Sequence, residues 1–260
     1  MADAIRLFAE FTDDLGDDWR LNIHDANYGA SAVEFKLGAD GFVLSYSGNN
    51  EDRHQSVIGS EITFTLTEEN AAHETFMDLL ATNTEARFSV SIRKDPDGTN
   101  DFWWGGILLP EQIVRPYDYE PIQNTLTASD DIGNLQSIVY NNDGTAYSGQ
   151  DSVIGHVLNC LNKMRTLHFW GTDDFLYYVN DFKSQQYTGA NQLLDTRISH
   201  YGLFNPDDAN TNQYYSTFEV LENLAKVFNA RVFQSQGKWW FLPVGAQKYS
   251  TTLTVEGTQK

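Results

Sequence analysis

Paired carboxylates are the side chains whose spacing best suits chemistry in this chain. Two such groups can serve as the general acid and base of glycoside hydrolysis, with tryptophans as sugar platforms. A general acid needs a raised pKa, which requires burial. The aspartate doublets lie among glycine and polar neighbours, so the sequence favours solvated loops for all of them: Asp13-Asp14, Asp17-Asp18 and Asp130-Asp131.

Nucleophilic catalysis has weaker support. His24-Asp25 could be half of a catalytic triad, but no Gly-x-Ser-x-Gly turn supplies an activated serine, and we interpret the pair as a solvated strand end. The single cysteine, Cys160, lies beside Leu158 and Leu161 on the apolar side of an expected helix. A thiol in that position packs as a small hydrophobic group.

Metal and phosphate motifs are also missing from the sequence. The 6 histidines form no His-Glu-x-x-His motif, and one cysteine cannot build a cysteine zinc site. Residues 95–101 place oxygen ligands on alternate positions as calcium loops do, but they lack the sixth-position Gly and the terminal Glu, so a hairpin turn is favoured. No glycine-rich phosphate loop occurs. The sequence therefore predicts no cofactor, no metal and no enzymatic activity.

Composition limits the remaining classes. The 260 residues carry a formal net charge of -19, which excludes a basic surface for nucleic acid. Hydrophobic residues make up 41% and aromatic residues 13%, too many for a disordered acidic chain. No apolar run is long enough to span a membrane, and the N-terminus lacks the pattern of a signal peptide. Residues 1–150 hold 26 acidic and 8 basic side chains, so nearly all of the excess charge lies there.

The elements that must position these groups are mostly strands in the first half. Apolar residues alternate with polar ones in seven short segments, a pattern typical of an antiparallel barrel or sandwich. One helix interrupts them, with Thr67 as its expected cap and Ala72, Phe76, Leu79 and Leu80 as its apolar stripe. We assign residues 1–128 to an acidic barrel-like domain. The alternating segments are 5–11, 19–23, 33–37, 42–46, 62–66, 88–92 and 122–128.

Helical spacing dominates the second domain, residues 129–260. Ile154, Val157 and Leu161 share one face of a helix that Ser148 or Asp151 could start. The segment 216–219 reads as a capping box for a helix that ends at Asn229, and a hairpin turning at 236–237 follows it. Residues 165–215 show weak periodicity and are expected to form a long loop region with short elements. Strands in the first domain and helices in the second make the predicted fold mainly β with helices, an α+β class.

A resemblance adds to this interpretation. The segment Phe-Trp-Trp-Gly-Gly-Ile-Leu-Leu-Pro at 102–110 leads to Pro116-Tyr117 and then to Asn-Thr-Leu-Thr-Ala-Ser-Asp-Asp-Ile-Gly-Asn-Leu at 124–135. These motifs, in this order, resemble bacteriophage tail-hub proteins, the central baseplate or tail-tip component, particularly in phages of Bacteroidetes-type hosts. Ile132 stands where that family more often has Leu. The opening segment 11–21 and the late segment 220–240 are similar too, so the likeness covers residues 5–244.

The resemblance implies two antiparallel barrel-like tube domains with helical insertions, the second within residues 129–260. It also implies a homotrimeric ring in the virion tail, made in the host cytoplasm, that continues the tail tube. Its partners would be tail tube or distal tail ring proteins on one side and distal tip or receptor-binding proteins on the other. DNA would pass through its channel without specific binding. An acidic wall repels phosphates, so candidate lumen-facing acids are Asp13, Asp14, Asp17 and Asp18, although these charges would also keep a free subunit soluble. Candidate interface aromatics, which could equally fill a core, are Phe169, Trp170, Tyr177, Tyr178, Tyr214 and Tyr215.

Three other interpretations stay open. The nearest is the hexameric distal tail ring, which differs in symmetry. A carbohydrate-binding module would use exposed Trp and Tyr rings to bind glycans as a monomer. A glycoside hydrolase would need two carboxyl groups facing each other across a cleft.

Overall fold

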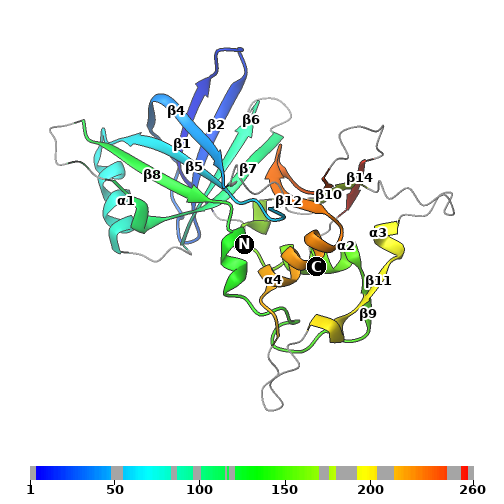
Figure 1. Ribbon diagram of the computed structural model, residues 1–260. Helices are drawn as coiled ribbons and strands as arrows, with labels where there is room; N and C mark the ends of the chain where they lie inside the picture. The colour runs from blue at the N-terminus through cyan, green and yellow to red at the C-terminus, as the bar shows by residue number, and fades with distance from the viewer. Residues whose placement is uncertain are drawn as a thin grey trace. The chain divides into compact units, whose positions relative to one another are not determined.

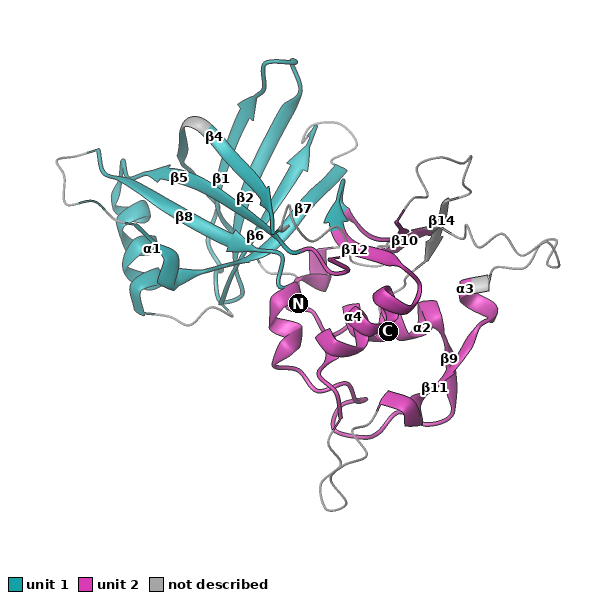
Figure 2. Ribbon diagram, in the orientation of Figure 1, with its two compact units in different colours: residues 1–47, 59–131, 234–237 teal, residues 48–58, 132–233, 238–260 magenta. Residues whose placement is uncertain are grey.

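The chain forms two compact units that are interleaved along the sequence (Figure 2). Unit 1 comprises residues 1–47, 59–131 and 234–237, and unit 2 comprises 48–58, 132–233 and 238–260. The main division thus falls between Asp131 and Ile132, a few residues after the expected boundary at 128, and two short segments cross it. The computed structural model describes residues 4–47, 55–82, 87–95, 101–114, 116, 121–169, 176–179, 192–203, 214–244 and 253–256.

Unit 1 is built on an eight-stranded sheet that curls into a nearly closed barrel (Figure 1). The strand order is β3-β1-β2-β6-β7-β8-β5-β4, and every pairing is antiparallel except that of β1 with β3. This confirms the mainly β fold with a barrel-like domain. The strands are β1 (Ala4–Thr12), β2 (Asp18–Asp25), β3 (Val33–Glu34), β4 (Lys36–Tyr46), β5 (Ser60–Thr67), β6 (Phe88–Lys94), β7 (Asp101–Leu108) and β8 (Gln123–Ser129).

The inward-facing residues of these strands form one apolar core. Leu21, Ile23, Val90 and Ile92 are fully buried on neighbouring strands, as the alternating pattern predicts. Helix α1 (Ala71–Thr82) adds Phe76, among others, to the same core.

Helix α1 begins later than the sequence suggested. Thr67 is the last residue of β5, and Asn70 takes the capping role, because its side-chain oxygen accepts hydrogen bonds from the amides of Ala72 and His73 at 3.0 and 3.1 Å. Asparagine at this position is as good a cap as threonine, and strand pairing with Gln123 holds Thr67 in the sheet.

Unit 2 combines helices with a smaller sheet whose strand order is β12-β13-β10-β14. Strands β10 and β13 run parallel, so the described part of this unit is a mixed sheet rather than a second antiparallel barrel. A two-stranded sheet, β9 with β11, lies apart from it. The elements are β9 (Gln150–Ser152), α2 (Val153–Leu161), β10 (Leu176–Val179), α3 (Gln192–Asp195), β11 (Arg197–Ser199), α4 (Thr217–Val227), β12 (Ala230–Ser235), β13 (Lys238–Pro243) and β14 (Leu253–Glu256). Short 3-10 turns are η2 (Pro110–Gln112), η3 (Ile132–Gln136), η4 (Arg165–Phe169) and η5 (His200–Leu203).

Local signals set the ends of the two long helices of unit 2. The cap of α2 is Ser152 rather than either expected residue, Ser148 or Asp151, and its hydroxyl accepts a hydrogen bond from the Gly155 amide. Helix α4 has the predicted capping box between Ser216 and Glu219. It stops near Asn229, whose φ of 46° is left-handed, as the sequence predicted.

The hairpin turn after β12 is as expected. Gln236 and Gly237 both have positive φ, 50° and 72°, which is the requirement of a two-residue turn matched to strand twist. The turn residues 234–237 belong to unit 1, where the Gly237 amide donates to the Trp103 carbonyl at 2.7 Å. A Cβ at position 237 would lie 1.9 Å from the Phe102 carbonyl oxygen, so only glycine fits.

Candidate functional site

Four aromatic side chains gather at one place on the barrel. The rings of Phe11 and Phe42 meet edge to face at 5.6 Å, and those of Trp19 and Trp103 at 5.1 Å. Phe42 also lies 6.1 Å from Trp19 and 6.3 Å from Trp103. Such edge-to-face pairs stabilise by about 0.5–1.5 kcal/mol each beyond area burial. The rings come from β1, β2, β4 and β7, so the barrel itself brings them together.

These rings line an open hollow of about 640 Å³. It lies between β1 and β4, the place where the barrel is not closed by a strand ladder. The segment of residues 33–46 explains the opening: its first residues, Val33 and Glu34, pair with β1, whereas the rest turns away to pair with β5. Strand β1 is therefore paired with this segment at Phe8, and the two separate towards Thr12. We call this opening, with its aromatic lining, the seam.

The four candidate lumen-facing acids lie in the hairpin of β1 and β2, where Asp18 is the first residue of β2 and Asp13 and Asp14 line the hollow. Asp13 ties the turn together, because it accepts hydrogen bonds from the amides of Leu15 and Asp17 and from the Trp19 indole, each at 2.9 Å. The Trp19 bond, followed by that of the Asp17 amide, lowers the pKa of Asp13. Asp17 pairs with Lys94, whose pKa this hydrogen bond raises.

The other two acids differ in their surroundings. Asp18 accepts from the Thr12 hydroxyl at 2.7 Å. Asp14 is exposed and lines the hollow. Three of the four carboxylates thus shape the hairpin, and Asp14 presents its charge to solvent.

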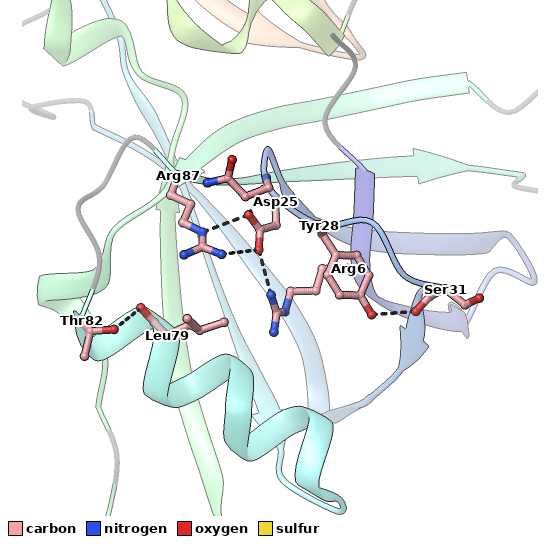
Figure 3. Close-up of polar contacts among 8 residues, drawn as sticks. Arg6, Asp25, Tyr28, Ser31, Leu79, Thr82 and Arg87 are labelled. Atoms are coloured by element: carbon pink, nitrogen blue, oxygen red, sulfur yellow. Dashed lines mark hydrogen bonds and ion pairs between the residues drawn. The ribbon is translucent and has the colours of Figure 1, made fainter.

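Asp25 is buried, not solvated as its sequence neighbours suggested. It accepts hydrogen bonds from Arg6 at 2.8 Å and from two nitrogens of Arg87, each at 3.0 Å (Figure 3). Burial acts to raise the pKa of Asp25, but the bonds from Arg87, the Asn27 amide and Arg6 outweigh it and lower the pKa. Its neighbour His24 bonds to the Ser91 hydroxyl at 2.8 Å. This cluster is a structural ion pair that joins β1, β2 and the segment before β6.

Asp130 is also buried, which corrects the expectation of a solvated loop. One of its oxygens accepts from both the amide and the hydroxyl of Ser60, at 2.6 and 2.8 Å, and that hydroxyl accepts from the Trp104 indole at 2.9 Å. Its neighbour Asp131 is 3% exposed and has a φ of 73°. These two residues and Trp104 belong to the motifs that carry the family resemblance, and here they lock β5, β7 and β8.

Unit 2 holds a buried cluster of Tyr and His side chains. The His156 Nε2 donates to the Ile198 carbonyl at 3.1 Å, so its Nδ1 accepts from the Tyr140 hydroxyl at 2.7 Å. The His200 ring lies 4.5 Å from His156 and stacks at 5.1 Å on Tyr147, which with His200 lines a polar hollow of about 730 Å³. Burial, and secondarily His156, lowers the pKa of His200.

The expected interface aromatics occupy different environments. Tyr178 is fully buried and fills the core of unit 2, so it offers no surface to a partner. Tyr177, on the opposite face of β10, is partly exposed and packs edge to face on Trp240 at 5.1 Å. Phe169, Tyr214 and Tyr215 are partly exposed, and Trp170 lies outside the described residues.

Other sequence-based expectations concern metals and thiols. Cys160 is fully buried, as predicted, and burial raises the pKa of its thiol. Most of the calcium-like segment, residues 96–100, lies outside the described residues. Across the described ranges, no three His, Cys, Asp or Glu side chains come together as metal ligands would. Within the same ranges, none of the helices is long and apolar enough to cross a membrane.

The comparisons with known proteins give a distant likeness. The chain matches no protein-family profile. No curated protein matches it in sequence. Among solved structures it is similar to the prophage tail protein gp18 from Listeria monocytogenes EGD-e, with a TM-score of 0.38 and 10% identity over 86% of this chain and 50% of that one. It is also similar to the 43 kDa tail protein of prophage MuSo2 from Shewanella oneidensis, with a TM-score of 0.35 and 12% identity over 78% of this chain and 55% of that one.

The chain thus spans about half the length of these two tail proteins. At such TM-scores the likeness establishes neither a shared fold nor a shared role.

The seam offers apolar rings and a carboxylate rim, whereas the two buried aspartates, Asp25 and Asp130, bond to structural partners. Sequence reasoning named Trp19 and Phe42 only as strand residues and did not predict the seam. The signal was present in the break of alternation at residues 38–41, where Gly38 and Gly41 interrupt the strand.

Proposed function

We propose that this protein is a structural component of a bacteriophage tail tip or baseplate: a hub ring, most simply a homotrimer, that continues the tail tube. It forms part of the DNA channel and joins tail tube or distal tail ring proteins to distal tip or receptor-binding proteins. In this proposal the chain is a building block of the virion tail and not an enzyme.

The observation that carries the proposal is that the tail-hub motifs, the barrel and most of the acidic residues occur in the same part of the chain. The segments that resemble tail hubs, 102–110 and 124–135, supply β7, β8 and the buried Trp104 and Asp130 of a nearly closed barrel. All eight strands of that barrel lie within residues 1–150, which carry 26 of the 36 acidic residues. A negatively charged wall lets DNA slide because it cannot bind phosphates. The two solved chains named above are prophage tail proteins, which agrees with the proposal without carrying it.

The experiment that tests the proposal is a symmetry-resolved electron cryomicroscopy reconstruction of the tail end of the particle that encodes this chain. Three copies around an axial channel are expected, with Asp14 among the carboxylates that face the lumen. Six copies would move the protein to the distal tail ring. Absence from the particle would overturn the proposal and favour a glycan-binding module or a glycoside hydrolase. Outward-facing acids in a trimeric ring would assign the charge to subunit solubility instead.

A further inference from the structure

The seam leaves part of the β1 edge without a strand partner. The Phe35 amide donates to the Phe8 carbonyl at 2.8 Å, so the backbone groups of Phe8 point away from β2. In an antiparallel pair this direction alternates, and the next outward positions are Glu10 and Thr12. The hydrogen bond between the Asp13 amide and the Asp17 carbonyl agrees with this alternation, since it places Asp13 on the β2 side. Among the described residues, β3 pairs only with Leu7 and Phe8, so no strand covers Glu10 or Thr12.

The opposite side of the seam is shaped by an irregularity in β4. Leu37 pairs with Leu66 and Phe42 with Phe64, so the four residues 38–41 are accommodated opposite a single residue of β5. Gly41 has a φ of 60°, which a bulged strand needs and most residues avoid. This bulge turns β4 away from β1 and leaves side-chain contact between Phe11 and Phe42, rather than a backbone ladder, to bridge the gap.

The rim of the hollow is acidic. Among the described residues that line it, Glu10, Asp13, Asp14 and Glu34 are acidic and Lys36 is the one cation. The Lys36 ammonium is already engaged, because it bonds to Glu69 at 2.8 Å. Asp14 and Glu34 are exposed, and Glu10, which is also exposed, forms an ion pair with Arg20 at 3.2 Å. The inside of the hollow is apolar, and its mouth attracts positive charge.

We propose that the seam is a binding site for an extended, basic segment of a partner protein, which adds as a strand along the β1 edge at Glu10 and Thr12. Main-chain hydrogen bonds give such an addition its affinity, and alternate side chains give it specificity. One set of side chains is apolar and enters the hollow lined by Trp19, Phe42 and Trp103. The other set is Lys or Arg and faces the carboxylates of the rim. The uncovered edge, residues 9–12, accommodates roughly four to six residues at about 3.3 Å each. This inference does not depend on the proposed role in a phage tail.

The test uses the full chain and a fluorescein-labelled peptide of four Lys-Val repeats, followed by fluorescence anisotropy at low and physiological salt. Saturable binding is expected. A Glu-Val peptide of the same length should fail to bind, and a Lys-Val peptide with N-methylated valines should bind about tenfold more weakly, because methylation removes the amides that pair with the strand edge. Equal binding of the methylated peptide would overturn strand addition, and absence of saturable binding would overturn the site.

Two matched pairs of variants locate the site. Thr12→Pro removes an outward amide at an exposed strand position, while Thr12→Ala removes only the hydroxyl that bonds Asp18. Thr12→Pro should weaken Lys-Val binding about three- to tenfold relative to Thr12→Ala. The double change Asp14→Lys with Glu34→Lys should weaken it more than Glu111→Lys with Asp143→Lys, which alters the net charge equally outside the seam.

Equal effects of the two double changes would reduce the interaction to bulk charge and overturn the proposal. Circular dichroism of each variant verifies folding. If Thr12→Pro does not fold, the site is still tested by substitutions at exposed positions: Thr12→Ala, Asp14→Lys and Glu34→Lys. Sedimentation velocity without peptide gives the remaining outcome. Self-association that Thr12→Pro abolishes would replace the basic partner with a second copy of this chain.

Discussion

At the residue scale, aspartates of similar sequence context have opposite environments. Asp14 and Asp25 both stand next to a strand end, yet one is exposed and the other fully buried. The difference comes from partners far away in the chain, since Arg6 and Arg87 lie 19 and 62 residues from Asp25. No local pattern contains such pairings. Burial of a carboxylate therefore could not be predicted from neighbouring residues, whereas burial of Cys160 on an apolar helix face could.

The Asp25 cluster should dominate the stability of unit 1. Asp25→Asn leaves two guanidinium groups, 11% and 20% exposed, without their carboxylate. Removing one partner of a buried ion pair costs about 3–5 kcal/mol of unfolding free energy. Urea denaturation followed by circular dichroism measures the loss. The control is Glu69→Gln, which breaks the exposed pair with Lys36 and should cost less than about 1 kcal/mol.

The same cluster gives a pH dependence with a defined sign. The pKa of Asp25 is lower in the folded chain than in the unfolded chain, so its stabilisation is complete above the unfolded pKa of about 3.9 and is lost as the pH falls through the folded value. Wild-type protein should therefore lose more unfolding free energy between pH 5 and acid than Asp25→Asn does. Parallel acid curves for the two proteins would contradict this expectation.

His200 should make unit 2 sensitive to milder acid. Its pKa is lowered by burial, so the folded unit favours the neutral ring. Stability is then full above the unfolded pKa of about 6.5 and decreases as the pH falls below it. Thermal unfolding at pH 7.5 and 5.5 should show a drop that His200→Phe reduces. Neighbouring groups that act on the same ring are His156, Tyr147 and Asp151, so an unchanged drop in His200→Phe would assign the effect to them.

At the element scale, the sequence predicted most strands because apolar residues recur at every second position, although β2, β6 and β7 each bury five consecutive residues. The strands of the barrel, the helices at 153–161 and 217–227 and the turn at 236–237 all follow from residue period and cap chemistry. The predicted helix cap was wrong at Thr67, because this residue pairs with Gln123 as part of β5. The break of alternation at residues 38–41 marks where the seam lies, but the strand period could not show that one continuous segment changes its pairing partner there from β1 to β5.

Two glycines allow the cost of a positive φ to be measured separately from the cost of a steric overlap. Gly144 and Gly237 have φ values of 85° and 72°, so an alanine at either position loses about 1–2 kcal/mol. A Cβ at Gly144 meets nothing within 4 Å, whereas one at Gly237 overlaps the Phe102 carbonyl. Gly237→Ala should therefore lower the melting temperature clearly more than Gly144→Ala. Similar melting temperatures for the two variants would mean that the turn adjusts freely around Phe102.

At the scale of the whole molecule, charge is the dominant feature. A net charge of -19 on 260 residues makes copies of the chain repel one another. If the chain forms a ring, its assembly should strengthen with ionic strength, because salt shortens the Debye length from about 30 Å at 0.01 M to about 8 Å at 0.15 M. Sedimentation velocity at these two salt concentrations measures the shift. Dissociation on adding salt would instead indicate an interface held by ion pairs.

The interleaving of the two units has a consequence for biosynthesis. Gly237, whose amide caps the Trp103 carbonyl, leaves the ribosome more than a hundred residues after the strand that it joins. During translation the Trp103 carbonyl therefore cannot form this hydrogen bond until nearly all of the second unit has been synthesised. A fragment cut between Asp131 and Ile132 would remain at that intermediate stage. The hairpin turn is thus the last part of unit 1 to be synthesised, although the strands of the barrel are synthesised first.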